Sequence, residues 1–120
     1  MLNCLCVGIG GFIGAVLRYL VGFLPLKSDG GFPIKTLLIN VIGAFAISLI
    51  TALAVKNKSD PHIILLLNVG VCGGFTTFST FAYETASLLQ KNAAGTAFTY
   101  AILSVVLCVA AIFGAKFCVR

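Results

Sequence analysis

Charge and tryptophan are scarce in this sequence, and both shortages narrow what the chain can be. Only 9% of its 120 residues are charged, 3 of them acidic, and tryptophan is absent. A soluble domain of this size carries about a quarter charged residues. The chain is instead 60% hydrophobic, with a mean hydropathy of +1.14. These values exclude a soluble domain and indicate an integral membrane protein.

The basic residues and the cysteines are spread along the chain without forming a recognisable site. The formal net charge is +5, but no contiguous basic face of the kind that binds nucleic acid is formed, so we expect no nucleic-acid partner. The cysteines are odd in number and lack metal-ligand spacing beside histidine, so we interpret them as free thiols in apolar packing. They are Cys4, Cys6, Cys72, Cys108 and Cys118.

Long apolar runs account for nearly the whole chain. Because about 20 residues cross the hydrocarbon core, these runs predict an all-α integral membrane protein with four transmembrane helices in a single domain. The first run is read as a span, since no basic region precedes it and no small-residue cleavage pattern ends it. Four short helices hardly enclose a polar pathway alone, so we expect an oligomer. The predicted spans are 2–24, 34–55, 61–89 and 96–117.

The third span contains residues that a plain membrane helix avoids. Asp60 followed by Pro61 predicts its start, with a capping oxygen and then a proline at the first helical position. Paired glycines and clustered hydroxyls then predict a break near 73–77. Broken helix in hydrocarbon is tolerated only where protein or water supplies hydrogen-bond partners, so the break is a candidate site for a polar ligand. The alternative is close helix packing through small residues.

A few polar residues lie inside the predicted spans. Asn40 either lines a polar pathway or hydrogen-bonds across helices. Arg18 either snorkels to the interface or faces a vestibule for anions. Glu84 follows the predicted break as the one carboxylate within a span. The fourth span carries a mildly polar stripe at a spacing of four, formed by Tyr100, Ser104 and Cys108.

After the predicted break, an aromatic face lies beside a hydroxyl face. Phe78 and Phe81 follow Phe75 at a spacing of three, and the same stretch holds hydroxyl residues. A phenyl ring has a positive edge, so ring edges, hydroxyls and an Asn amide can hold a small anion without a fixed cation. The alternative is that these rings only pack. The candidate hydroxyl residues are Thr77, Ser79 and Thr80.

Basic residues are nearly balanced between the two sides of the membrane. With four spans, one side carries four loop or terminal basic residues and the opposite side three. This gives almost no positive-inside bias, so we predict that the chain inserts both ways up and that two copies pair antiparallel. The first side carries Lys56, Lys58, Lys116 and Arg120, and the second carries Lys27, Lys35 and Lys91.

Three strings of residues resemble the Fluc/CrcB family of fluoride channels. The most specific is GGFTTFSTF at Gly73–Phe81, supported by GGFIGAVLRY at Gly10–Tyr19 and TLLINVIG at Thr36–Gly43. The resemblance covers essentially the whole chain. It implies an antiparallel dual-topology homodimer that lies in the lipid of the cell membrane and contains two fluoride pores. No nucleotide motif or catalytic constellation is evident, which agrees with a passive channel rather than an enzyme.

The same resemblance implies roles for individual residues. Phe78 and Phe81 would be the pore phenylalanines, Asn40 the pore asparagine and Arg18 a vestibule arginine. Backbone carbonyls of Gly73 and Thr76 from both subunits would hold a central Na⁺. A polar track beside the pore would contain Glu84, Tyr100 and Ser104, whereas the role of Cys108, where a small hydroxyl residue is expected, stays open.

Two other functions fit a short four-helix membrane protein. A proton-coupled multidrug exporter needs a carboxylate at the centre of a substrate cavity. Glu84 would have to serve, and the lack of tryptophan weakens an aromatic chamber for organic cations. A non-conducting accessory subunit is the third possibility.

Overall fold

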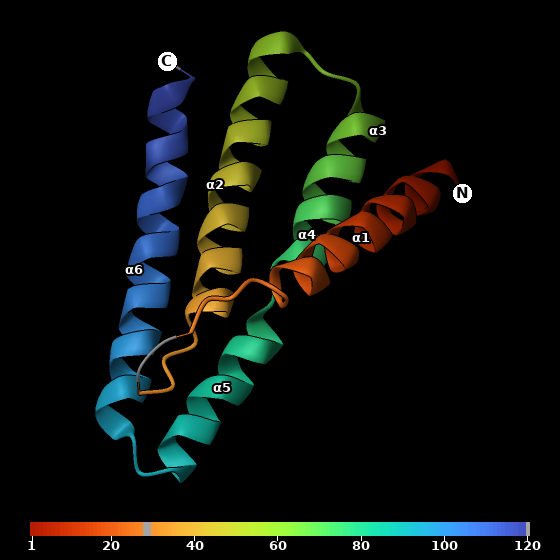
Figure 1. Cartoon of the computed structure of the whole chain (residues 1–120). Helices are drawn as coiled ribbons and strands as arrows, with labels where there is room; N and C mark the ends of the chain where they lie inside the picture. Colours follow the sequence, from red (N-terminus) through yellow and green to blue (C-terminus); the bar gives the residue numbers. More distant parts are fainter. Residues whose placement is uncertain (28–29, 120) are drawn as a thin grey trace.

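The computed structural model describes residues 1–27 and 30–119, and over these residues the only regular elements are helices (Figure 1). Four helical spans are long and apolar enough to cross a membrane. The predicted all-α, four-span architecture is therefore confirmed. The elements are α1 (Leu2–Val21), α2 (Ile34–Asn57), α3 (Pro61–Ile64), η1 (Leu65–Cys72), α4 (Gly73–Phe75), α5 (Phe78–Gln90) and α6 (Ala94–Cys118).

The helix ends differ from the predicted ones by three residues at most. α1 ends at Val21 rather than at 24, because the next three residues form a tight turn. Lys35 Nζ donates to the Gly22 carbonyl at 2.6 Å and holds this turn against the start of α2. α2 and the third span run two and one residues beyond the predicted ends, and α6 begins two residues earlier and ends one later. Arg120, which entered the charge comparison, lies outside the described residues.

The third span begins at the predicted cap. Asp60 Oδ1 accepts a hydrogen bond from the His62 backbone N–H at 2.7 Å, and Pro61 occupies the first helical position. The span continues through the π-helical segment η1, in which the backbone is wound more widely than in an α-helix. Together these features place a distorted helical segment immediately before the predicted break.

The break itself is narrower than predicted. Gly73 and Gly74 are helical, and only Thr76 and Thr77 leave the helix, both with extended backbone. Gly74 is needed for packing instead, because a Cβ on it would lie 2.5 Å from the Gly11 carbonyl oxygen of α1. The alternative interpretation, close packing through small residues, therefore holds for this glycine.

Glycines bring α1 and the first half of the third span into backbone contact. A Cβ on Gly10 would overlap the Leu66 carbonyl oxygen, and a Cβ on Gly14 would overlap that of Val71. From the other side, a Cβ on Gly70 would lie 2.7 Å from the Gly10 Cα. The GxxxG spacing of Gly10 and Gly14 thus lets α1 pack closely on η1 and α4, which it crosses obliquely in Figure 1.

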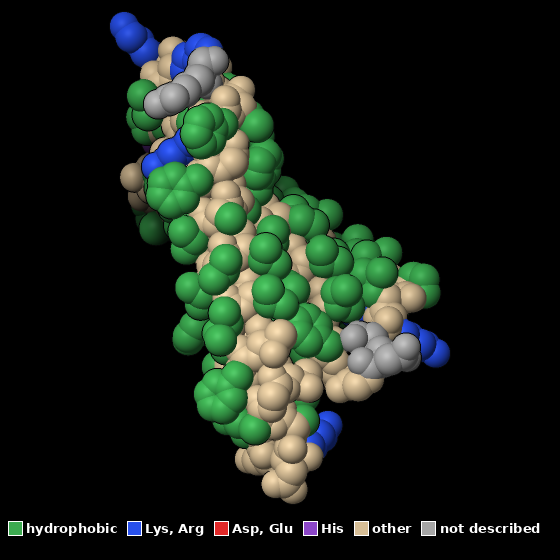
Figure 2. All heavy atoms as spheres, turned by 90° about the vertical axis from the view of Figure 1, so that its left-hand side faces the viewer, with side chains coloured by type: hydrophobic (Ala, Val, Ile, Leu, Met, Phe, Trp, Pro, Cys, Tyr) green, Lys and Arg blue, Asp and Glu red, His purple; other side chains and the backbone are tan. Residues whose placement is uncertain are grey.

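α2 and α6 form the other packed pair and run side by side along the molecule (Figure 1). A small core joins them to α5, formed by Leu37, Leu88, Ala97 and Tyr100. Outward-facing residues are mostly apolar: Figure 2 shows hydrophobic side chains over most of one face, with the visible Lys and Arg towards its ends. This distribution suits a surface in contact with lipid acyl chains.

Candidate functional site

Asn40 satisfies the backbone at the break. Its Nδ2 donates to the Thr77 carbonyl at 3.1 Å, and its Oδ1 accepts from the Thr77 N–H at 2.9 Å. The side-chain amide therefore replaces the backbone partner that the Thr77 N–H loses at the break, and it adds a donor to the Thr77 carbonyl, which as the N-cap also accepts the first bond of α5. In hydrocarbon an unpaired backbone group costs several kcal/mol, so these two hydrogen bonds explain why the chain tolerates the interruption. One Nδ2 hydrogen of Asn40 is left over, since the amide has two.

Hydroxyl side chains cap the helix that follows. Thr77 is the N-cap of α5, and its Oγ1 accepts from the Thr80 N–H at 3.2 Å. The same hydroxyl donates to Thr80 Oγ1 at 3.0 Å and lies 3.4 Å from Ser79 Oγ. These three predicted residues therefore lie together at the start of α5, where their hydroxyls cap the helix that follows the break.

A cavity of about 340 Å³ opens beside the break, between α2, α5 and α6. Six of the predicted site residues line it, whereas Ser79, Thr80 and Tyr100 do not. Ser104 is 6% exposed, and its Oγ has no hydrogen-bond partner among the described residues. A buried hydroxyl without a partner is costly unless a ligand or water completes it. The predicted site residues that line the cavity are Asn40, Thr76, Thr77, Phe78, Phe81 and Ser104.

The two phenylalanines of the cavity have different surroundings. Phe81 is half-buried, and its ring lies 5.1 Å from that of Tyr100 and 5.6 Å from that of Phe78. Phe78 is 79% exposed. Phe81 is thus held in place by this chain alone, whereas most of the Phe78 ring is free to contact lipid or another chain.

Glu84 belongs to a separate hydrogen-bond network next to the cavity. Its Oε1 accepts from the Thr36 hydroxyl at 2.8 Å, and its Oε2 accepts from the Tyr100 hydroxyl at 2.8 Å. Thr36 is 5% exposed and Tyr100 is fully buried. Both carboxylate oxygens therefore have hydroxyl donors, and the network ties α5 to α2 and α6.

Arg18 reaches the break from the opposite side. Its Nη1 donates to the Thr76 carbonyl at 3.3 Å. Arg18 does not line the cavity that contains Asn40 and Ser104. The guanidinium therefore adds a positive charge close to the interrupted backbone without forming part of the cavity wall.

The break also frees the two carbonyls that the resemblance assigns to a sodium ion. In a continuous helix, the Gly73 and Thr76 carbonyls would accept from the N–H groups four residues later. Those N–H groups, of Thr77 and Thr80, are donated to Asn40 Oδ1 and to Thr77 Oγ1 instead. Carbonyl oxygens without helical partners are suitable ligands for a hard cation. Thr76 shares its oxygen with Arg18.

Two residues of this region were not among the predicted site residues with a defined role. Thr36 lies one helical turn before Asn40 on the same face of α2 and binds Glu84. That spacing was visible in the sequence, but the partner of Thr36 was not. Cys108 lines the cavity one turn after Ser104, so the predicted stripe on α6 does face the site with these two members.

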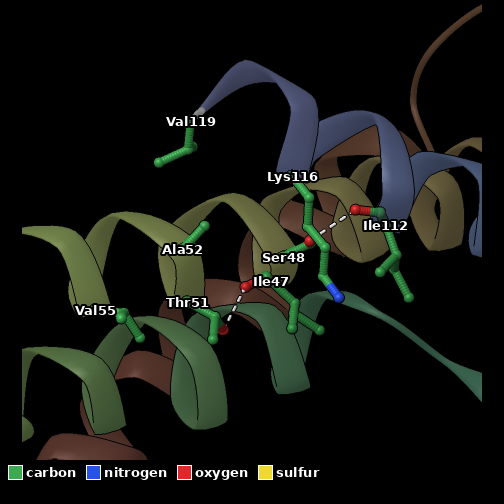
Figure 3. A pocket seen from close by; sticks show the side chains of 8 residues that line it. All are labelled: Ile47, Ser48, Thr51, Ala52, Val55, Ile112, Lys116 and Val119. Atoms are coloured by element: carbon green, nitrogen blue, oxygen red, sulfur yellow. Dashed lines mark hydrogen bonds between the residues drawn. The ribbon is translucent and has the colours of Figure 1, made fainter.

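A second and larger cavity, of about 520 Å³, lies further along the α2–α6 groove (Figure 3). Its hydroxyls are already engaged: Ser48 donates to the Ile112 carbonyl at 2.8 Å, and Thr51 donates to that of Ile47 at 2.7 Å. Only Lys116 in its lining offers a charged donor. The smaller cavity has the unpartnered hydroxyl and the aromatic rings, so we take it as the candidate site.

The four apolar spans define the class: the chain is a multi-pass membrane protein. Comparison with known proteins identifies its family. The model described as "CrcB-like protein, Camphor Resistance (CrcB)" matches residues 5–115. The chain belongs to the CrcB family.

Relatives from several bacteria carry the name "Fluoride-specific ion channel FluC". The one from Caulobacter vibrioides (strain NA1000 / CB15N) is 46% identical over 116 residues, which cover 94% of this chain and 91% of the relative. The one from Ruminiclostridium cellulolyticum is 44% identical over 110 residues, with coverage of 90% and 85%. The one from Shewanella loihica is 44% identical over 109 residues, with coverage of 90% and 88%.

Proposed function

We propose that this protein is a fluoride-selective channel that passively exports fluoride from the cytoplasm and so reduces its toxicity. The observation that carries this proposal is the cavity beside the break, where the Asn40 amide, the Phe78 and Phe81 rings and the unpartnered Ser104 hydroxyl meet. The names of relatives 44–46% identical to this chain support it.

The lining suits a small, strongly hydrated anion. Within the part of the chain that the structure describes, no Lys or Arg lines this cavity. A fixed cation would bind an anion too tightly for rapid release, and conduction needs sites that let go. Ring edges carry partial positive charge, and the free Asn40 and Ser104 hydrogens are donors. Fluoride would thus exchange water for several weak donors in succession.

Export in this mechanism needs no energy source other than the membrane potential. Fluoride enters acid-stressed cells as neutral hydrogen fluoride and ionises at cytoplasmic pH. The negative-inside membrane potential then drives the anion outward, at about 2.3 kcal/mol per elementary charge for each 100 mV. The protein therefore acts as a channel and not as an enzyme, and its place is the cell membrane.

We further propose that the working unit is an antiparallel homodimer. The exposed Phe78 ring is suited to contact a second copy, and a two-fold pair would repeat each contact on both copies. The near balance of basic residues between the two sides supports insertion both ways up. Reporter fusions at the C-terminus test this idea: we expect both orientations in one membrane, and a single orientation would refute dual topology.

A sodium ion held by the Gly73 and Thr76 carbonyls of both copies is part of this proposal. These carbonyls have lost their helical N–H partners, which donate to side-chain oxygens instead, and this supports the proposal. When bound, the ion would supply positive charge that offsets repulsion between nearby anions. Replacing Na⁺ with N-methylglucamine during dialysis of the purified protein should lower its thermal stability, and unchanged melting would argue against the ion.

The decisive experiment is ion efflux from liposomes that contain only this protein. We expect fluoride efflux without proton coupling and much slower chloride efflux. Proton-coupled uptake of an organic cation would instead indicate the multidrug exporter, and inactivity in both assays would indicate an accessory subunit. The exporter needs a carboxylate free to exchange protons and substrate, whereas both Glu84 oxygens already accept hydrogen bonds.

A further inference from the structure

Cys108 is the one cysteine that lines the candidate site. It lies in the wall of the cavity of about 340 Å³ and is half-buried. Cys72 is buried, at 4% exposure, and neither it nor the remaining cysteines line this cavity. The cavity therefore presents one particular thiol to whatever enters it.

A second group in the cavity indicates that a ligand belongs beside this thiol. Ser104 lies one helical turn from Cys108, is 94% buried, and has an Oγ with no partner among the described residues. Because an unpaired buried hydroxyl is unfavourable, its natural partner is the ion or water that occupies the cavity. An ion or water that pairs with Ser104 therefore lies in the same cavity that Cys108 lines.

We propose that Cys108 is a modification site for small thiol-directed reagents, and that its modification closes the fluoride path. This inference rests on the proposed function. The class of ligand is a neutral alkyl thiosulfonate, which is small enough for the cavity and specific for thiols. A methylthio group on Cys108 would project an apolar substituent beside the Ser104 hydroxyl and remove the S–H, itself a weak donor.

The reaction is an ordinary thiol exchange. The Cys108 thiol loses its proton to solvent, and the thiolate attacks the divalent sulfur of methyl methanethiosulfonate. A new S–S bond forms between Cys108 and the methylthio group, the S–S bond of the reagent breaks, and methanesulfinate leaves. A phosphine or dithiothreitol reduces the mixed disulfide and restores the thiol.

The test measures fluoride efflux from liposomes before and after treatment, with intact and peptide mass spectrometry to locate the methylthio groups. We expect treatment to lower wild-type flux about tenfold, as the added group obstructs a narrow ion path. Reduction should restore the flux. Each variant is compared with its own untreated flux.

Two serine variants on the same helix provide the controls. Cys108→Ser should make the flux insensitive to the reagent, although the other four cysteines remain. Cys118→Ser should stay as sensitive as wild type, because Cys118 is exposed at the end of α6 and lines neither cavity.

The outcomes separate this inference from the proposed function. Untreated protein that carries no fluoride refutes the proposed function, and the closing of the path with it. Flux that persists when Cys108 carries the methylthio group refutes only the inference. A Cys108 that stays unlabelled, or a Cys108→Ser variant that is still inhibited, refutes it equally.

Discussion

The two halves of the third span contrast in how they are held. The first half, from α3 to α4, touches α1 backbone to backbone through Gly70 and Gly74. The second half, α5, is held by side chains: by the core around Leu88 and by the Glu84 network. One half is therefore fixed by close backbone approach, and the other by hydrogen bonds and ring contacts.

This difference assigns separate tasks to the two halves. Close glycine packing leaves no room for a ligand, so the first half serves as an anchor. α5 leaves ring surface exposed, with Phe78 at 79%, and carries the hydroxyls and the carboxylate. The extended residues Thr76 and Thr77 between the halves let the site-bearing helix take its own direction without disturbing the anchor.

The largest expected effect follows from disrupting the hydrogen bonds between Asn40 and Thr77 at the break between the two halves. Asn40→Asp keeps an acceptor for the Thr77 N–H but places carboxylate oxygen against the Thr77 carbonyl. The lost bond and the buried negative charge should together cost several kcal/mol, because hydrocarbon does not solvate a carboxylate. We expect fluoride flux at background and a lower melting temperature.

Asn68→Asp is the matched control for that change. Asn68 binds Thr51 between η1 and α2 but does not touch the break. It should lose stability while keeping measurable flux per folded molecule. Unchanged flux in Asn40→Asp would contradict a pore role for Asn40, and an unchanged melting temperature would contradict its role in stabilising the break.

Disturbing the anchor should have the next largest effect. Gly14→Ala drives a Cβ into the Val71 carbonyl, and such overpacking costs about 1–3 kcal/mol. Thermal unfolding in detergent should show this loss. Gly8→Ala on the same helix meets nothing within 4 Å and should change stability by no more than about 0.5 kcal/mol. Equal melting of the two variants would contradict the anchor role of Gly14.

Changing the rings of the site should affect flux more than stability. Phe78→Ile and Phe81→Ile keep apolar bulk but remove the positive ring edges. We expect each to lower fluoride flux about tenfold, equivalent to ~1.4 kcal/mol of barrier, with the oligomeric state unchanged by gel filtration. Phe98→Ile, at an exposed position of α6 outside the cavity, is the control. Near-wild-type flux in both site variants would make these rings packing residues only.

The smallest effect is expected within the network that holds α5. Tyr100→Phe keeps the ring contact with Phe81 but removes the 2.8 Å bond to Glu84. Side-chain hydrogen bonds within membranes average ~0.6 kcal/mol, so the free energy of unfolding, measured by thermal denaturation, should fall by about that amount. Tyr83→Phe, at a 76% exposed position, should leave it unchanged. A loss of several kcal/mol would mean that this network, rather than the core, determines the position of α5.

Much of this fold was predictable because the bilayer leaves few options. Apolar length gave the four spans, and the Asp60–Pro61 pair gave the start of the third. The position of the break was predicted only approximately. Gly73 and Gly74 signal both helix breaking and close packing, and the choice depends on whether another helix approaches, which local sequence does not reveal.

The site was predictable as a set of residue types, but not as a set of pairs. Asn40 could line a pathway or bond across helices, and it lines the cavity while binding Thr77. Glu84 instead pairs with Thr36 of another span, and the sequence did not reveal this pair. Such pairings arise from the tertiary arrangement of α2 and α5. The pore roles, the sodium ion and the antiparallel dimer stay predictions.

The pair of hydrogen bonds between Asn40 and Thr77 also has a consequence for biogenesis. α5, at 13 residues, rises ~20 Å and is too short to cross a ~30 Å core by itself. Because α2 precedes the third span in the chain, the ribosome synthesises Asn40 before Thr77. The two hydrogen bonds from Asn40 therefore tie the third span to a span that is translated before it.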